Sequence, residues 1–184
     1  MLNKNQRKQI CEANLIRLAE NKGFQFTDTF FPYTSGQIGP YYVNSECVMK
    51  NKRAFSGACL DLTEIIDDKI QGEGDCIAGG ESRDWVFSNT VAFYLKMAPV
   101  MIYNDGKVLG DMNNKRVVLV CDLNNEGSSP RDKWVPTIKK AGGTVEHIFF
   151  YVDRLEDGVK EMEKLGLYHD AVVPLNNSAW DYLQ

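Results

Sequence analysis

The sequence predicts a single α/β domain, residues 1–184, built on a central, mostly parallel sheet flanked by helices. The length fits one domain, since most domains contain roughly 50–250 residues. From residue 75 onward, short apolar runs alternate with stretches of helical character, which is typical of a sheet with helices on both faces. Residues 117–121 (VVLVC) are consecutively apolar, as expected for a strand that is buried on both faces.

The composition excludes several classes of protein. With 43% hydrophobic and 25% charged residues the chain is not wholly disordered, and a net charge of −4 argues against a basic nucleic-acid-binding surface. No apolar run approaches the roughly 20 residues of a membrane span, and the N-terminus lacks the apolar block of a signal peptide. Five cysteines without a CxxC pair argue against a disulfide framework or a zinc site. We therefore expect a reduced, cytoplasmic protein without a nucleic-acid or membrane partner.

Two amphipathic helices are predicted in the first part of the chain. The first covers residues 5–22 and ends at Gly23, and the second ends at Gly72 and Gly74. The residues between the helices are rich in aromatics and turn formers, and we expect short extended pieces there. The apolar faces are formed by Cys11, Leu15, Leu18 and Ala19 in the first helix and by Phe55, Ala58, Cys59, Leu62 and Ile66 in the second.

The second part of the chain alternates between strands and helices. Because ligands of such sheets bind beyond the carboxyl ends of the strands, the residues that follow each strand are candidates for a site. The predicted strands are 76–78, 100–103, 117–121 and 145–152, and the predicted helices are about 82–97, 130–141 and 156–165. Trp180 and Tyr182 follow the last of these elements and suggest a docking tail or a dimer contact.

An acid and a hydroxyl-rich turn follow strand 117–121. Asp122 lies at the predicted strand tip, and Gly127, Ser128 and Ser129 lead into a helix that begins at Pro130. Free backbone N–H groups and hydroxyls at a helix start form an anion site, and an acid just upstream suits sugar hydroxyls. The alternative is an ordinary serine N-cap followed by a turn.

Arginines follow two other strands. After strand 76–78, a Gly79-Gly80 turn would let the backbone approach a ligand, and Arg83 offers a planar group for a phosphate. The alternative is a turn with a capping Ser82 and a surface arginine, and no GxGxxG fingerprint is present. After strand 145–152, Arg154 is suited to bind a carboxylate through two hydrogen bonds, with an Asp–Arg surface pair as the alternative.

In their order along the chain, residues 35–44, 77–83, 117–129 and 152–158 resemble motifs of type I phosphoribosyltransferases, among them orotate phosphoribosyltransferases. The resemblance implies that a pyrimidine base such as orotate reacts with phosphoribosyl diphosphate (PRPP), releasing diphosphate in pyrimidine nucleotide synthesis. It further implies magnesium held mainly by PRPP, a homodimer, and a small hood formed by residues 1–50 together with the C-terminal tail.

The resemblance also assigns roles to individual residues. Asp122 would hold the ribose hydroxyls, and Lys107 would act with it in catalysis. Arg83 and Lys107 would face the diphosphate. The remaining PRPP-binding residues would be Asn124, Asn125, Gly127, Ser128 and Ser129, and the base-binding residues would be Ser35, Gly36, Tyr41, Tyr42 and Arg154.

Several positions depart from the family pattern. Cys121 replaces the first of two adjacent acids, Glu126 introduces a negative charge, and Thr34 replaces a lysine. The family's long cationic loop corresponds to the short stretch 104–114, which offers only Lys107. These departures favour an alternative, a catalytically weakened protein of this fold that senses PRPP or nucleotides, whereas Arg154 favours an enzyme that accepts an acidic base. An unrelated nucleotide-binding protein is a weak interpretation because no P-loop or dinucleotide motif is present.

Overall fold

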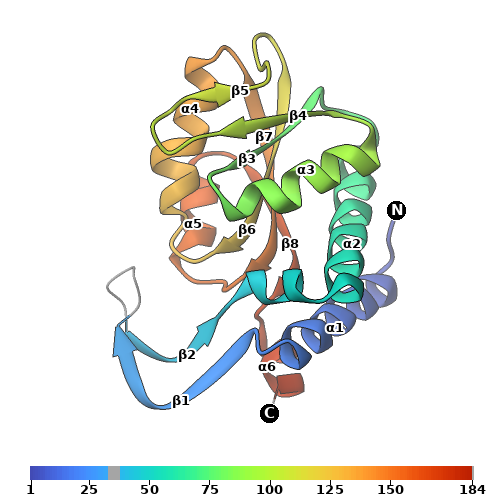
Figure 1. Cartoon of the computed structure of the whole chain (residues 1–184), viewed down its shortest axis with the longest axis vertical. Coiled ribbons are helices and arrows are strands. Elements are labelled where there is room, and N and C mark those ends of the chain that lie inside the picture. Colours follow the sequence, from blue (N-terminus) through green and yellow to red (C-terminus); the bar gives the residue numbers. More distant parts are fainter. Residues whose placement is uncertain (33–37, 184) are drawn as a thin grey trace.

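A six-stranded sheet forms the centre of the computed structural model, which describes residues 1–32 and 38–183 (Figure 1). Its strand order is β5-β4-β3-β6-β7-β8, and all neighbouring pairs are parallel except β4 and β5. The predicted fold class is confirmed. The strands are β3 (Cys76–Gly80), β4 (Ala98–Ile102), β5 (Val108–Leu109), β6 (Arg116–Asn124), β7 (Thr144–Asp153) and β8 (Tyr168–Pro174).

Helices cover both faces of this sheet, as predicted (Figure 1). Successive side chains of β6 point to opposite faces, so Val118 and Val120 join one apolar core while Val117 and Leu119 join the other. This is why the run at 117–121 is apolar throughout. The first core contains α1 (Lys4–Glu20), α2 (Lys52–Ile70) and α3 (Arg83–Leu95), and the second contains η2 (Pro130–Trp134), α4 (Val135–Lys140) and α5 (Asp157–Lys164).

The first helix ends slightly earlier than predicted. The residue in the left-handed conformation is Lys22, at φ 59°, and not Gly23. Gly23 is needed for a different reason, because a Cβ there would lie 2.7 Å from the Cys47 Sγ. The second helix ends as predicted, with Gly72 at φ 81° after the left-handed Gln71.

The aromatic segment between α1 and α2 forms an antiparallel pair of strands outside the main sheet. These are β1 (Phe24–Pro32) and β2 (Ile38–Val43), which are followed by the short helix η1 (Ser45–Lys50). Figure 1 shows this pair projecting from the end of the domain where α6 (Asn177–Leu183) lies.

The C-terminal segment folds back onto its own chain. Strand β8 and helix α6 were not predicted, and α6 places the Trp180 ring 4.8 Å from the Tyr41 ring and 6.4 Å from the Phe26 ring, between centroids. The cysteines are all unpaired, as predicted. Within residues 1–32 and 38–183, none of the helices has both the length and the apolar character needed to cross a membrane.

Candidate active site

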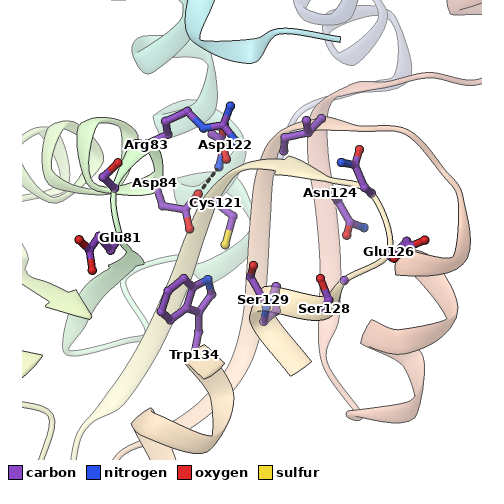
Figure 2. Close-up of a pocket in the computed structure, with 15 residues that line it drawn as sticks. Glu81, Arg83, Asp84, Cys121, Asp122, Asn124, Glu126, Ser128, Ser129 and Trp134 are labelled. Atoms are coloured by element: carbon purple, nitrogen blue, oxygen red, sulfur yellow. Dashed lines mark hydrogen bonds and ion pairs between the residues drawn. The ribbon is translucent and has the colours of Figure 1, made fainter. Parts of the chain in front are cut away.

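A pocket of about 180 Å³ opens at the carboxyl end of β6 (Figure 2). Its walls come from the first residues after β3, from the turn that joins β6 to η2, and from the Trp134 side chain. The described lining residues are Glu81, Ser82, Arg83, Asp84, Cys121, Asp122, Leu123, Asn124, Asn125, Glu126, Gly127, Ser128, Ser129, Pro130 and Trp134.

Asp122 is the best-anchored acid of this pocket. Its side chain is nearly buried, and its Oδ2 accepts a hydrogen bond from the Ser45 Oγ at 2.7 Å and lies 3.3 Å from the Arg83 Nε. Its backbone N–H donates to the Asp84 Oδ1 at 2.8 Å. Residues from η1, α3 and β6 thus fix one carboxylate at the edge of the pocket.

The turn after β6 leads into a helix whose start faces the pocket. Gly127 has a φ of 68°, a conformation that favours glycine, and a Cβ there would lie 2.9 Å from the Met162 Cε. The Ser129 side chain makes no capping hydrogen bond within the described residues, which argues against an ordinary serine N-cap. The Ser128 and Ser129 hydroxyls and the adjacent N–H groups remain suited to an anion.

Gly79 and Gly80 are the last residues of β3 and not a turn, and their lack of a side chain serves packing within the protein. A Cβ on Gly80 would lie 2.1 Å from the Trp134 ring, and one on Gly79 would lie 2.2 Å from the Ser88 Oγ. Protein side chains therefore account for the absence of a Cβ at both positions, and the approach of a ligand to this backbone stays a prediction. Ser82 makes no capping hydrogen bond to α3 within the described residues, so the alternative of a capped turn is unsupported.

Carboxyl groups dominate the charge of the pocket. The described lining residues include four acids, and Arg83 is the one arginine or lysine among them. Burial, followed by the charge of Asp122, raises the pKa of Asp84 well above its ordinary value. Burial likewise raises the pKa of the Cys121 thiol, which therefore stays neutral. The acids are Glu81, Asp84, Asp122 and Glu126.

A second cluster surrounds Arg154, directly after β7. The Arg154 Nη2 lies 2.7 Å from the Glu156 Oε1, its Nε donates to the Tyr41 hydroxyl at 3.3 Å, and its guanidinium lies 4.6 Å from the centre of the Tyr41 ring. The Tyr41 hydroxyl in turn donates to Glu156 at 3.1 Å. An open pocket beside Arg154 is also lined by Leu175 and Trp180.

Three known proteins are similar to this chain in sequence or in fold. Orotate phosphoribosyltransferase of Sulfolobus acidocaldarius is 29% identical over 145 residues, which are 74% of this chain and 71% of that protein. The crystal structure of orotate phosphoribosyltransferase from Aeropyrum pernix superimposes with a TM-score of 0.80 at 20% identity, over 92% of this chain and 98% of that one. Orotate phosphoribosyltransferase of Mycobacterium tuberculosis in complex with PRPP gives a TM-score of 0.65 at 18% identity, over 89% and 96% of the two chains.

The chain is similar to orotate phosphoribosyltransferases in sequence and in fold. The resemblance inferred from four short motifs is thereby confirmed, and the two solved structures show that the fold is shared. No protein-family model matches the sequence.

The structure gathers most of the predicted site residues, although their roles stay predictions. The residues predicted to contact PRPP all line the first pocket except Lys107, and Tyr41 meets Arg154 in the second cluster. Tyr42 precedes Val43 on β2, is 43% exposed, and lies on the opposite face of that strand from Tyr41. Ser35 and Gly36 lie outside the described residues, as does Thr34.

Lys107 lies apart from both clusters. Residues 104–107 form the tight turn between β4 and β5, in which the Tyr103 N–H donates to the Lys107 carbonyl oxygen at 2.9 Å. The Lys107 Nζ lies 5.1 Å from the centre of the Tyr103 ring, and Lys107 is not among the described residues that line the first pocket. The predicted loop 104–114 is therefore largely a hairpin with a short strand.

Four residues near these clusters were not recognised as part of them from the sequence. Ser45 directly follows the motif at 35–44, and Asp84 directly follows the motif at 77–83. Their nearness to these motifs was the signal that could have identified them. Glu156 lies two residues after Arg154 and neutralises its charge. From the sequence alone, an acid at that position looks like an ordinary surface residue. Trp180 was predicted to belong to a docking tail or a dimer contact, but its partner Tyr41 was not predicted, because the two residues are far apart in the sequence.

Proposed function

We propose that this protein transfers the phosphoribosyl group of PRPP to orotate or a similar acidic pyrimidine base and releases diphosphate. The observation that carries the proposal is the pairing of two sites at adjacent strand ends. The buried Asp122 carboxylate lies beside a hydroxyl-rich helix start, and Arg154 lies one strand away, its N–H donating to the Asn124 carbonyl oxygen at 3.0 Å.

The first pocket is suited to the phosphoribosyl part of PRPP. The Asp122 carboxylate can accept hydrogen bonds from the two ribose hydroxyls, which are donors. The backbone N–H groups and hydroxyls of Ser128 and Ser129 can donate to the terminal phosphate. Arg83 is 47% exposed on its side chain and can turn toward the diphosphate while it stays near Asp122.

Magnesium fits this site as part of the substrate. The pocket lining holds more carboxyl groups than cations, so a highly charged diphosphate needs added positive charge to enter. Residues 1–32 and 38–183 contain no cluster of three or more acidic, histidine or cysteine side chains arranged to hold a metal. We therefore propose that magnesium arrives bound to PRPP oxygens, which neutralises the leaving group.

The chain's own contribution to the reaction is to hold the two substrates in line. As the bond from the ribose carbon to diphosphate weakens, positive charge develops on the ribose and negative charge on the departing oxygen. Arg83 is placed to stabilise the departing oxygen. Arg154 would bind the carboxylate of the base and so orient its ring nitrogen toward the ribose carbon.

A sensor that binds PRPP without turnover is the second candidate. It is favoured by Glu126, a carboxylate that lines the pocket near the proposed phosphate site, and by the position of Lys107 outside the pocket. Purified protein supplied with PRPP, magnesium and a panel of bases decides between the two. Diphosphate release with an acidic pyrimidine supports the enzyme, whereas PRPP binding by calorimetry without release supports the sensor.

A homodimer in the cytoplasm is part of the same proposal. It is supported by apolar side chains on the surface of α3 and β5, where Phe93 is 78% exposed and Leu109 is 50% exposed. Sedimentation velocity of the wild type and of Phe93→Ser tests it. A dimer that the substitution weakens supports the proposal, and a monomeric wild type at micromolar concentration contradicts it.

A further inference from the structure

Asp84 lies beside the proposed ribose-binding carboxylate and is nearly as buried. It occupies the first turn of α3 and is 8% exposed, while Asp122 is 6% exposed. The Asp84 Oδ1 accepts the Asp122 N–H at 2.8 Å (Figure 2). Two carboxyl groups from different elements therefore share one buried corner of the pocket.

The partners of these two acids are unequal. The Asp122 Oδ2 receives the Ser45 hydroxyl and the Arg83 guanidinium, whereas Asp84 forms no ion pair in the described part of the chain. Its other close neighbour is the Cys121 thiol, which burial keeps neutral. The Arg83 guanidinium also lies 3.9 Å from Glu46 at its Nη1, so its charge is shared.

Arg83 pairs with Asp122, and no cation pairs with Asp84 among the described residues. If both buried carboxyl groups were ionised, the negative charge of Asp84 would have no compensation. A buried charge that lacks a partner is costly, and a group in this position takes up a proton instead. We propose that Asp84 carries a proton in the folded protein and that this neutral acid positions the Asp122 carboxylate. The proposal rests on the proposed function only where it concerns PRPP. The single negative charge of the pair then lies on Asp122, at the edge of the pocket.

A neutral Asp84 is compatible with its hydrogen bonds. Burial and the charge of Asp122 outweigh the effects of the Asp122 N–H and the Cys121 thiol, which act to lower the pKa of Asp84. A neutral carboxylic acid has a carbonyl oxygen that can accept the Asp122 N–H and an O–H that can donate to a neighbouring carboxylate. An ionised Asp84 would present only acceptors beside a second carboxylate. Burial and the charge of Asp122 both raise the pKa of Asp84, in the direction the geometry requires.

The stability of the protein tests the proton without any ligand. The unfolded chain releases this proton at a pKa of about 3.9, while the folded protein retains it. The folded state thus binds one more proton than the unfolded state between these two pKa values. The free energy of unfolding therefore falls as the pH rises from about 4 toward the raised pKa. Asp84→Asn has no such proton, so its stability relative to the wild type should grow steadily over that range, measured by urea unfolding.

A flat difference between the variant and the wild type, or a difference that shrinks as the pH rises, would overturn the proposal. The wild-type protein offers a second measurement that requires no folded variant. NMR of the aspartate carboxyl carbons should show one residue that is still protonated at neutral pH, and its absence would equally refute the proposal.

PRPP binding tests the positioning role. Asparagine reproduces a neutral acid, since it accepts through its carbonyl oxygen and donates through its amide. We therefore expect Asp84→Ala to weaken binding of PRPP with magnesium by about tenfold, because the Asp122 N–H loses its buried acceptor, and Asp84→Asn to restore most of it. If asparagine loses as much as alanine, Asp84 acts as an ionised ligand and the proposal fails. If PRPP binds to neither variant nor to the wild type, the proposed function fails while the two proton measurements still decide the charge of Asp84.

Discussion

Replacing Arg154 separates base recognition from PRPP binding. The Arg154 side chain is 4% exposed, and it is paired with Glu156, which is 22% exposed. Each charged hydrogen bond from Arg154 to an acidic base contributes roughly 1.5–3 kcal/mol, so the loss of a single bond sets the lower limit of the effect. Arg154→Ala should therefore weaken orotate binding by at least about 10- to 150-fold, since each 1.4 kcal/mol is about tenfold. PRPP affinity should change little, because Arg154 does not line the first pocket.

The same substitution also affects stability. Removing one partner of a buried ion pair costs roughly 3–5 kcal/mol, and water can partly reach Glu156, so a loss of about 2–3 kcal/mol is expected. Arg154→Lys is the matched variant. Lysine restores the charge near Glu156 but cannot form the planar two-bond contact, so stability should recover more than orotate affinity does.

Calorimetry with orotate and with PRPP, at a temperature where every variant is folded, measures both effects. Arg116 supplies a surface control, because it pairs with Asp75 at the opposite end of β6 from both clusters, and Arg116→Ala should leave both affinities unchanged. If the two ligands lose affinity equally in Arg154→Ala, or if neither does, Arg154 does not bind the base carboxylate.

The other predictions concern the first pocket. Asp122→Asn should weaken PRPP binding by about 1–3 kcal/mol in calorimetry, and an unchanged affinity would remove Asp122 from the site. If Lys107 stabilises the leaving group, Lys107→Ala should lower kcat more than it raises KM. Arg83→Ala tests the cation that lines the pocket. The variant with the larger loss of kcat identifies the residue that acts on the diphosphate. Gly80→Ala should destabilise the protein by roughly 1–3 kcal/mol in urea unfolding, because its Cβ would lie 2.1 Å from the Trp134 ring, and a stable variant would show that the ring moves easily.

The sequence was most informative where local patterns determine structure. The apolar run of β6, the acid at its end and the hydroxyl-rich turn are contiguous, so Asp122 and its neighbours could be identified together. The paired acid Asp84 could not, because the contact depends on how α3 packs against β6. An acid in the first turn of a helix has an ordinary local explanation in the helix dipole.

Long-range contacts explain the remaining differences. Strand β8 is the last strand of the sheet, and its short apolar run carries little periodicity of its own. Trp180 and Tyr41 are far apart in sequence and meet only after α6 has docked. Gly79 and Gly80 were interpreted as ligand-approach glycines because a sequence does not show which side chain will fill the space they leave.

Two asparagines at the end of β6, Asn124 and Asn125, show how the two sites are joined. The Asn124 Nδ2 donates to the Asp153 Oδ2 at 3.1 Å, and the Gly158 N–H donates to the Asn125 carbonyl oxygen at 3.0 Å. A Cβ on Gly158 would lie 2.3 Å from the Asn124 Oδ1, so the two loops are packed as closely as glycine allows. Because Asp153 directly precedes Arg154, a displacement of the turn after β6 must also displace the proposed base-binding arginine. The Asn125 link runs through its backbone carbonyl, which any residue offers, whereas the Asn124 link runs through its side chain. Substitution of Asn124 should therefore affect both ligands together.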